Sequence, residues 1–285
     1  MKRGIMKRGI MKRGIMKRGT LLLMLLPGYA FLYLPIALMV VFGFNDSRLV
    51  SVWSRFSFRW YVALAHNDAL IDAALLSLRI AAGSATLATL LGTAAGYALT
   101  RGGRFPGRTW FATTLAVPLV LPDVIFGLAL LLLFVGAQGL IGFPAERGAG
   151  TITIAHATFA FAYVAVVVQA RLADAGTDLE EAAADLGARP WVVFWRITVP
   201  LMAPALLSGW LLAFTLSLDD LVVASFVGGP GATTLPMRIF SAARLGVTPE
   251  FYALATIMLA IVLLTLVGAW LARRWLPVAR RAGVL

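Results

Sequence analysis

The amino-acid sequence predicts an all-α membrane protein with six transmembrane helices and both termini in the cytoplasm. Apolar residues make up 60% of the 285 positions and charged residues only 13%, whereas a soluble domain has about 25% charged residues. Six apolar runs are long enough, at about 20 residues, to cross a hydrocarbon core of about 30 Å as helices. They are residues 20–44, 73–100, 109–135, 151–170, 201–227 and 251–272.

The distribution of Lys and Arg gives the orientation of these spans. With the N-terminus inside, the inner segments carry 18 basic residues and the outer segments carry six. Cytoplasmic loops are enriched in Lys and Arg, so we expect the outer loops at residues 44–72, 136–150 and 228–250. The net charge of +12 is therefore a sign of membrane orientation, and we expect no nucleic-acid partner.

The residues that the chain lacks exclude several functional classes. It has no Cys and only two His, His66 and His156, so we expect no metal site and no other cofactor. All four Lys lie in the first 17 residues and each precedes Arg, whereas a phosphate-binding P-loop needs Lys followed by Ser or Thr. We therefore expect no ATP hydrolysis by this chain. His156, in the fourth span, is expected to be a hydrogen-bonded packing residue, with a proton relay as the alternative.

The chain divides into four predicted regions. Residues 1–19 repeat the motif MKRG and should form a disordered basic tail, which could alternatively bind anionic membrane lipid. Residues 20–72 comprise the first transmembrane helix and an outer segment. Residues 73–272 form a five-helix core, and residues 273–285 a second basic tail.

The cytoplasmic loop at residues 171–200 has the clearest local pattern. Thr177 and Glu180 have the spacing of a capping box that begins a helix, Gly187 stands where a C′ glycine would end it, and Pro190 suits the first turn of a second helix. A narrow apolar face is formed by Leu179, Ala182, Ala183 and Leu186. This face could dock another protein or pack on its own helical bundle.

The same loop resembles the EAA loop of ABC importer permeases. Glu181-Ala182-Ala183, Gly187, Ile197 and Val199-Pro200 follow the pattern E-A-A-x3-G-x9-I-x-L-P, with Val199 in place of Leu. The resemblance implies a type I ABC importer (MetI-like) permease fold in the bacterial inner membrane. It also implies that Glu181, Ala182, Ala183 and Gly187 couple the permease to an ABC ATPase dimer, so that this chain is a transporter subunit and not an enzyme.

Further motifs are similar to the polyamine branch of these permeases, and in particular to putrescine permeases. They are Phe42-x-Phe-Asn45, Leu121-Pro-Asp-Val124, Phe214-Thr-Leu-Ser-Leu-Asp-Asp-Leu, Ser225-Phe-Val-x-Gly-Pro-Gly-Ala-Thr-Thr-Leu-Pro236, Gly246-Val-x-Pro-Glu250 and Ala253-Leu-Ala-Thr256. The resemblance implies a second homologous permease subunit and a periplasmic polyamine-binding protein as partners. Spermidine or another small solute is the alternative substrate.

Asp123, Asp219 and Asp220 are the acidic residues within the predicted spans. Because a charge in a membrane is costly, each should face a polar cavity or a partner. They could line a pathway for a cationic substrate, or they could pair with an arginine such as Arg79 or cap a broken helix near Pro118 or Pro122. Adjacent residues on a helix diverge by about 100°, so we expect at most one of Asp219 and Asp220 to face the pathway.

Two other functional classes are alternatives to a transporter subunit. An integral membrane enzyme could use the Asp219/Asp220 pair as acid and base, although no His, Lys or metal set accompanies that pair in the sequence. A channel would conduct its solute without ATP.

Overall fold

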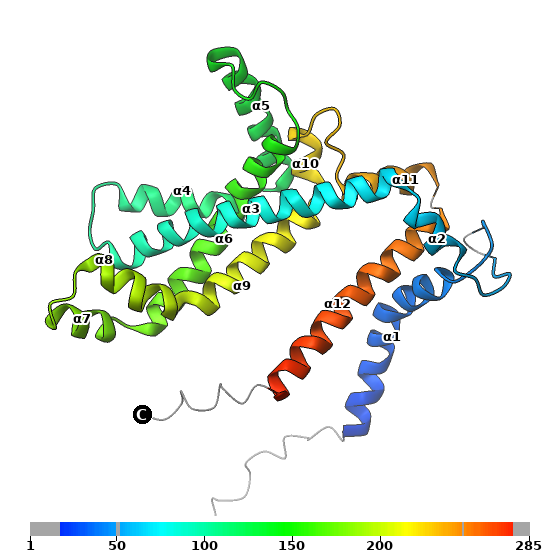
Figure 1. The fold of residues 1–285 in the computed structure, drawn as a ribbon, viewed down its shortest axis with the longest axis horizontal. Coiled ribbons are helices and arrows are strands. Elements are labelled where there is room, and N and C mark those ends of the chain that lie inside the picture. The colour runs from blue at the N-terminus through cyan, green and yellow to red at the C-terminus, as the bar shows by residue number, and fades with distance from the viewer. Residues whose placement is uncertain (1–17, 50–51, 247, 276–285) are drawn as a thin grey trace, which may run out of the picture. The chain divides into compact units, whose positions relative to one another are not determined.

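The computed structural model describes residues 18–49, 52–246 and 248–275 (Figure 1). The predicted disorder of the tail at 1–19 therefore lies outside the described residues, except for the last two positions, which begin a helix. The predicted tail at 273–285 likewise lies outside them after its third residue.

Helices make up almost all of the regular structure. In the described ranges the extended pairing is limited to one isolated bridge, between Asn45 and Phe56. A helix satisfies its backbone hydrogen bonds within one segment, which is what a bilayer requires. The chain divides into two units, residues 1–66 with 247–285, and residues 67–246.

In its described residues the first unit holds three helices: α1 (Arg18–Phe42), α2 (Arg59–Ala65) and α12 (Pro249–Trp275). α12 packs against both of the others. The connection between α1 and α2 is organised by the buried Asn45, whose amide group donates to the carbonyl of Val52 at 2.7 Å. Its side-chain oxygen accepts the N–H of Ser54 at 3.0 Å, and its carbonyl accepts the indole N–H of Trp60 at 2.6 Å. Asn45 thus fixes the end of the Phe42-x-Phe-Asn45 motif.

The second unit holds the remaining helices: α3 (Asp68–Arg101), α4 (Arg108–Val120), α5 (Asp123–Ile141), α6 (Ala149–Ala175), α7 (Asp178–Asp185), α8 (Pro190–Val193), the π-helical turn η1 (Phe194–Thr198), α9 (Val199–Leu218), α10 (Val222–Val227) and α11 (Leu235–Leu245). Helices α3, α6 and α9 lie side by side and form its centre (Figure 1).

Small residues allow α3 and α6 to approach closely. A Cβ atom on Gly92 would lie 2.7 Å from the carbonyl oxygen of Phe161 and 2.7 Å from the Cβ of Val164. One turn later, a Cβ on Gly96 would lie 2.9 Å from the carbonyl oxygen of Ala165. Helices in membranes associate through such close packing, because burial of apolar surface gives little gain in lipid.

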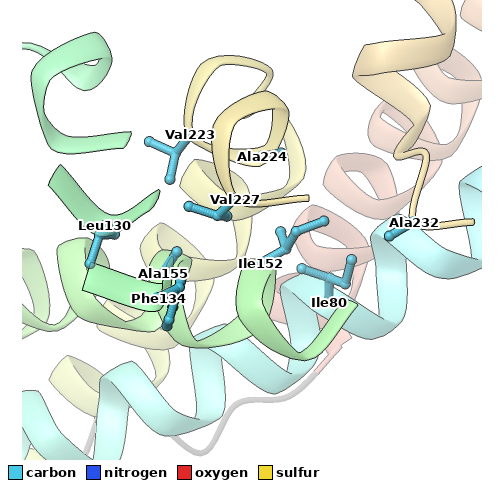
Figure 2. Close-up of a cluster of buried hydrophobic side chains, with 9 residues drawn as sticks. All are labelled: Ile80, Leu130, Phe134, Ile152, Ala155, Val223, Ala224, Val227 and Ala232. Atoms are coloured by element: carbon cyan, nitrogen blue, oxygen red, sulfur yellow. The ribbon is translucent and has the colours of Figure 1, made fainter. Parts of the chain in front are cut away.

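A cluster of buried apolar side chains holds α5 and α10 against α3 and α6 (Figure 2). It consists of Ile80, Leu130, Phe134, Ile152, Ala155, Val223, Ala224, Val227 and Ala232. This packing fixes the positions at which α5 and α10 begin.

The third predicted span, 109–135, is not one helix. α4 ends at Val120 and α5 begins at Asp123, and Leu121 between them is extended with φ −69° and ψ 134°. Pro122 explains this break, because proline has no N–H to donate and disfavours helical geometry in the residue before it.

The fifth predicted span, 201–227, is also divided. α9 ends at Leu218 and α10 begins at Val222. The carboxylate of Asp220 accepts the N–H groups of Val223 and Ala224 at 3.3 and 2.7 Å. A side chain therefore takes the place of the backbone carbonyls that a continuous helix would offer to these amides.

The structure supports five membrane-spanning helices by length and composition. Among the described residues they are 25–42, 68–101, 123–141, 149–175 and 190–218. The sixth predicted span, 251–272, lies within α12, whose described apolar stretch Pro249–Leu264 is shorter. Six spans and the cytoplasmic position of both termini remain predictions.

Candidate functional site

Five helices surround a cavity of about 340 Å³ in the second unit. Its wall is formed by the end of α4, the start of α5, the middle of α6, the end of α9 and the start of α10, so both helix breaks border it. Three carboxylates and three aromatic rings line it: Asp123, Asp219, Asp220, Phe126, Phe159 and Tyr163. The fold thus brings together the three membrane carboxylates that the sequence singles out.

Asp220 is held by other parts of the protein. Its side chain is 9% exposed, and its Oδ2 accepts a hydrogen bond from the Nε2 of His156 at 3.0 Å. The same carboxylate accepts the two amide groups at the start of α10. Asp220 therefore caps the start of α10, at the break after α9, which is a different break from the one expected near Pro118 or Pro122.

Asp219 lies at the end of α9 and its side chain is exposed. Asp219 and Asp220 both border the cavity, and the expectation that at most one of them faces the substrate pathway stays a prediction. The 100° separation of adjacent helical residues does not apply to this pair, because α9 ends before both residues. Their contacts nevertheless differ, because Asp220 is bound by His156 whereas Asp219 forms no ion pair within the part of the chain that the structure describes.

Asp123 is the first residue of α5 and is also exposed. The described residues place neither Asp123 nor Asp219 in an ion pair with Arg79, whose side chain is exposed on α3. The two accessible carboxylates of the cavity are therefore not neutralised by any arginine in the described part of the chain.

His156 is buried, with 1% of its surface exposed, and uses both ring nitrogens. Its Nδ1 lies 2.7 Å from the Oγ of Ser217, and its ring meets Phe159 edge-on at 5.6 Å between centroids. These contacts agree with the expected hydrogen-bonded packing residue. The expectation that no histidine accompanies the aspartate pair is wrong, because folding brings His156 to Asp220 across 64 positions.

Ser217, His156 and Asp220 have the composition of a hydrolase triad but not its accessibility. Ser217 is buried and its hydroxyl is engaged by the imidazole. A nucleophilic serine must reach its substrate, so this arrangement acts as a structural hydrogen-bond network between α6 and the break after α9.

The helix predicted in the loop at residues 171–200 is present as α7. Its end has the hydrogen bonds of a Schellman motif, from the N–H of Ala188 to the carbonyl of Ala183 at 3.0 Å and from the N–H of Gly187 to the carbonyl of Ala184 at 2.9 Å. Gly187 has φ +80°, which glycine adopts without strain. Pro190 is the first residue of α8, as expected.

Most of the apolar face of α7 is exposed, and only its Ala183 is half-buried. Leu179 is 59% exposed and Leu186 is 89% exposed, and both Glu181 and Ala182 are exposed between them. Next to this helix, Trp191 of α8 is 69% exposed. This accessibility favours docking over packing on its own bundle.

The predicted capping box is not formed. Thr177 makes no side-chain capping hydrogen bond. Glu180 instead accepts hydrogen bonds from the Nε of Arg101 and the Oγ1 of Thr198, each at 2.8 Å. Sequence reasoning missed these contacts because Arg101 lies 79 positions away from Glu180.

Residues 88–277, about two thirds of the chain, match the family model of the binding-protein-dependent transport system inner membrane component. The chain belongs to this family. This permease is therefore a multi-pass protein of the inner membrane, and its family implies ATPase and binding-protein partners. It is a transporter subunit and not an enzyme.

Two relatives from Escherichia coli (strain K12) resemble this permease over most of its length. The putrescine transport system permease protein PotI is 55% identical over 249 residues, which are 87% of this chain and 89% of PotI. The spermidine/putrescine transport system permease protein PotC is 41% identical over 246 residues, which are 86% of this chain and 90% of PotC.

A solved structure supports the fold of this permease. One chain of a bacterial ABC transporter involved in the import of the acidic polysaccharide alginate matches with a TM-score of 0.68 and 17% identity. The match covers 93% of this permease and 99% of that chain. At this identity the likeness shows the importer permease fold alone.

Proposed function

We propose that this permease is one membrane subunit of an ATP-driven polyamine importer with putrescine as its substrate. The observation that carries the proposal is the 55% identity to PotI, compared with 41% to PotC, over nearly the same part of the chain. The printed name of PotC also includes spermidine, which makes spermidine the second candidate substrate.

The cavity suits a diamine. Putrescine has an ammonium group at each end of an apolar stem, so a site for it needs separated carboxylates with apolar or aromatic walls. Asp123 and Asp219 supply accessible carboxylates from two different helix ends, and Phe126, Phe159 and Tyr163 supply the walls.

The three aspartates have different proposed roles. Asp123 and Asp219 face the substrate directly, since both are exposed and neither is paired in the described residues. Asp220 lines the same cavity, but its contacts with His156 and with the start of α10 make it a structural part of the pathway.

The exposed side of α7 is proposed to dock the ATPase. Glu181 and Ala182 are exposed, Ala183 is half-buried, and Gly187 ends the helix with a left-handed turn. A short helix with small side chains permits close approach by a partner. We place α7 and both chain termini on the cytoplasmic side of the membrane, as the distribution of Lys and Arg predicts.

The transport cycle is proposed to follow alternating access. One permease chain forms half of the pathway, and a second homologous permease forms the other half. A substrate-loaded periplasmic polyamine-binding protein docks on the outer loops. Closure of an ABC ATPase dimer then acts through α7 and changes which side of the membrane the cavity faces.

The experiment is uptake by the full complex in proteoliposomes. ATP-dependent entry of radiolabelled putrescine is measured with unlabelled putrescine, spermidine or 1,4-butanediol, an uncharged analogue of the same length, as competitors. We expect putrescine to compete best and the diol not to compete. Asp219→Asn should raise the KM for putrescine roughly tenfold, equivalent to about 1.4 kcal/mol, at unchanged abundance.

Each other result has a definite meaning. Stronger competition by spermidine would make spermidine the substrate. Uptake that needs no ATP would indicate a channel. If neither polyamine enters in an ATP-dependent way, or if the diol competes equally, the polyamine proposal is wrong.

A further inference from the structure

We propose that Glu180 is the positioning residue that joins α7 to the membrane helices, so that movement of α7 reaches α3 and α9. This inference rests on the proposed docking of the ATPase at α7. Glu180 stands immediately before the Glu181-Ala182-Ala183 motif, and that motif assigns it no role.

One carboxylate of α7 contacts two other elements. The Oε2 of Glu180 accepts from the Nε of Arg101, the last residue of α3, at 2.8 Å. The Oε1 accepts from the hydroxyl of Thr198, the last residue of η1, at 2.8 Å. Both oxygens of Glu180 are thus used, and neither contact is local in sequence.

The ion pair is largely sheltered from solvent. The side chains of Arg101 and Glu180 are 12% and 15% exposed, and Thr198 is buried. Exposed ion pairs contribute little to the stability of a protein. A sheltered pair with additional hydrogen bonds, by contrast, holds its two partners in a defined geometry. Removal of one partner leaves the other charge uncompensated.

Arg101 extends the connection to a third helix. Its Nη2 donates to the carbonyl of Leu172 at 3.1 Å and to the carbonyl of Gly176, both at the end of α6. A guanidinium is favourable there, because carbonyl groups at a helix C-terminus carry partial negative charge. Glu180 and Arg101 together therefore join α3, α6, α7 and η1.

The two sides of α7 are accordingly different. Glu181 and Ala182 are exposed for a partner, whereas Glu180 is turned to the body of the second unit. The turn that Glu180 contacts continues directly into α9, and its Phe194 meets Tyr97 of α3 edge-on at 5.2 Å. A displacement imposed on the exposed side of α7 thus reaches α9 and α3 through this group.

The test measures coupling in the complete complex, with the second permease, the ATPase and the binding protein in proteoliposomes. Variants are Glu180→Ala, Glu180→Gln, Arg101→Gln and the double variant Arg101→Gln/Glu180→Gln. The matched control is Asp174→Asn, an exposed carboxylate in the last turn of α6. Readouts are membrane abundance, co-purification of the ATPase, and putrescine transported per ATP hydrolysed.

We expect normal abundance and normal co-purification in the single variants, with transport per ATP lowered at least about fivefold, the lower end of common coupling strengths. Glu180→Gln keeps an acceptor for Thr198, so its defect should be smaller than that of Glu180→Ala. The double variant should lose little more than either single variant, because the two residues act as one unit. Asp174→Asn should match the parent.

Two results would overturn the inference. Parental transport per ATP in Glu180→Ala would show that the contact carries no movement, and loss of abundance in all Glu180 variants would show a role in folding alone. Failure of the docking role is separable, because it is tested by co-purification of the ATPase with Glu181 variants. If those variants retain the ATPase, the docking assignment fails whatever Glu180 does.

Discussion

The imidazole Nε2 of His156 lies 3.0 Å from the Oδ2 of Asp220, and both groups are sheltered from solvent. This contact ties the middle of α6 to the break between α9 and α10, beside a cavity that Asp219 also lines. The geometry of the candidate substrate site therefore depends on a pair that need not touch substrate.

Asp220→Asn should affect assembly more than substrate affinity. The amide keeps the shape of the carboxylate but weakens its hydrogen bonds with His156 and with the start of α10. We expect lower abundance of the subunit and an unchanged KM for putrescine in the complexes that remain. Immunoblotting of membranes and uptake assays check both. A raised KM at parental abundance would instead give Asp220 a direct contact with substrate.

His156→Ala should destabilise the complex by about 1–3 kcal/mol, the cost of leaving buried polar groups without a partner. Asp220 and Ser217 lose their shared partner together. The measurement is thermal unfolding of the purified complex in detergent, with His66→Ala on the exposed end of α2 as the control. Equal stability of the two variants would contradict the proposed network.

Gly92→Ala should lower the amount of folded permease. Its Cβ would meet the backbone of Phe161 and the side chain of Val164 at 2.7 Å, and overpacking of this kind costs about 1–3 kcal/mol. Gly136→Ala on α5 is the matched control, because a Cβ there has no neighbour within 4 Å. Detergent-extracted permease is quantified by size-exclusion chromatography. Parental yield for both variants would show that the α3–α6 contact can relax.

Glu181→Lys and Gly187→Trp should each release the ATPase and abolish uptake while membrane insertion is retained. Lys reverses an exposed charge on α7, and Trp adds bulk at a turn with φ +80°. Co-purification of the ATPase subunit is the measurement. Asp174→Lys makes the same charge reversal outside α7 and should retain the ATPase. If both α7 variants bind it and transport at the parental rate, docking occurs elsewhere.

Much of the fold could be predicted from apolar run length, since most runs of about 20 residues became helices. The failures have local causes. Pro122 interrupts the third run and the carboxylate of Asp220 interrupts the fifth, and both residues lie in segments that are apolar enough to look continuous. Run length measures hydrophobicity and does not detect where a side chain replaces a backbone acceptor.

The candidate site was predicted in part. The predictions that Gly187 ends one helix and that Pro190 begins the next are confirmed. Both depend on the backbone geometry of the residue itself, which is local in sequence. The partners of Glu180 and His156 are 79 and 64 positions away from them. Local spacing therefore suggested a capping box for Glu180, and only the packing of α3, α6 and α9 reveals its actual contacts.

The two helix breaks also bring four helix ends to the cavity. α5 and α10 begin there, and the positive ends of their peptide dipoles face Asp123 and Asp220. α4 and α9 end there, and each C-terminus contributes roughly half of a negative elementary charge. The two positive and the two negative helix ends cancel, so the excess negative charge that favours a cation comes from the carboxylates that line the cavity. The preference for cations therefore resides in the side chains, and it would weaken if the Asp219 side chain were neutral.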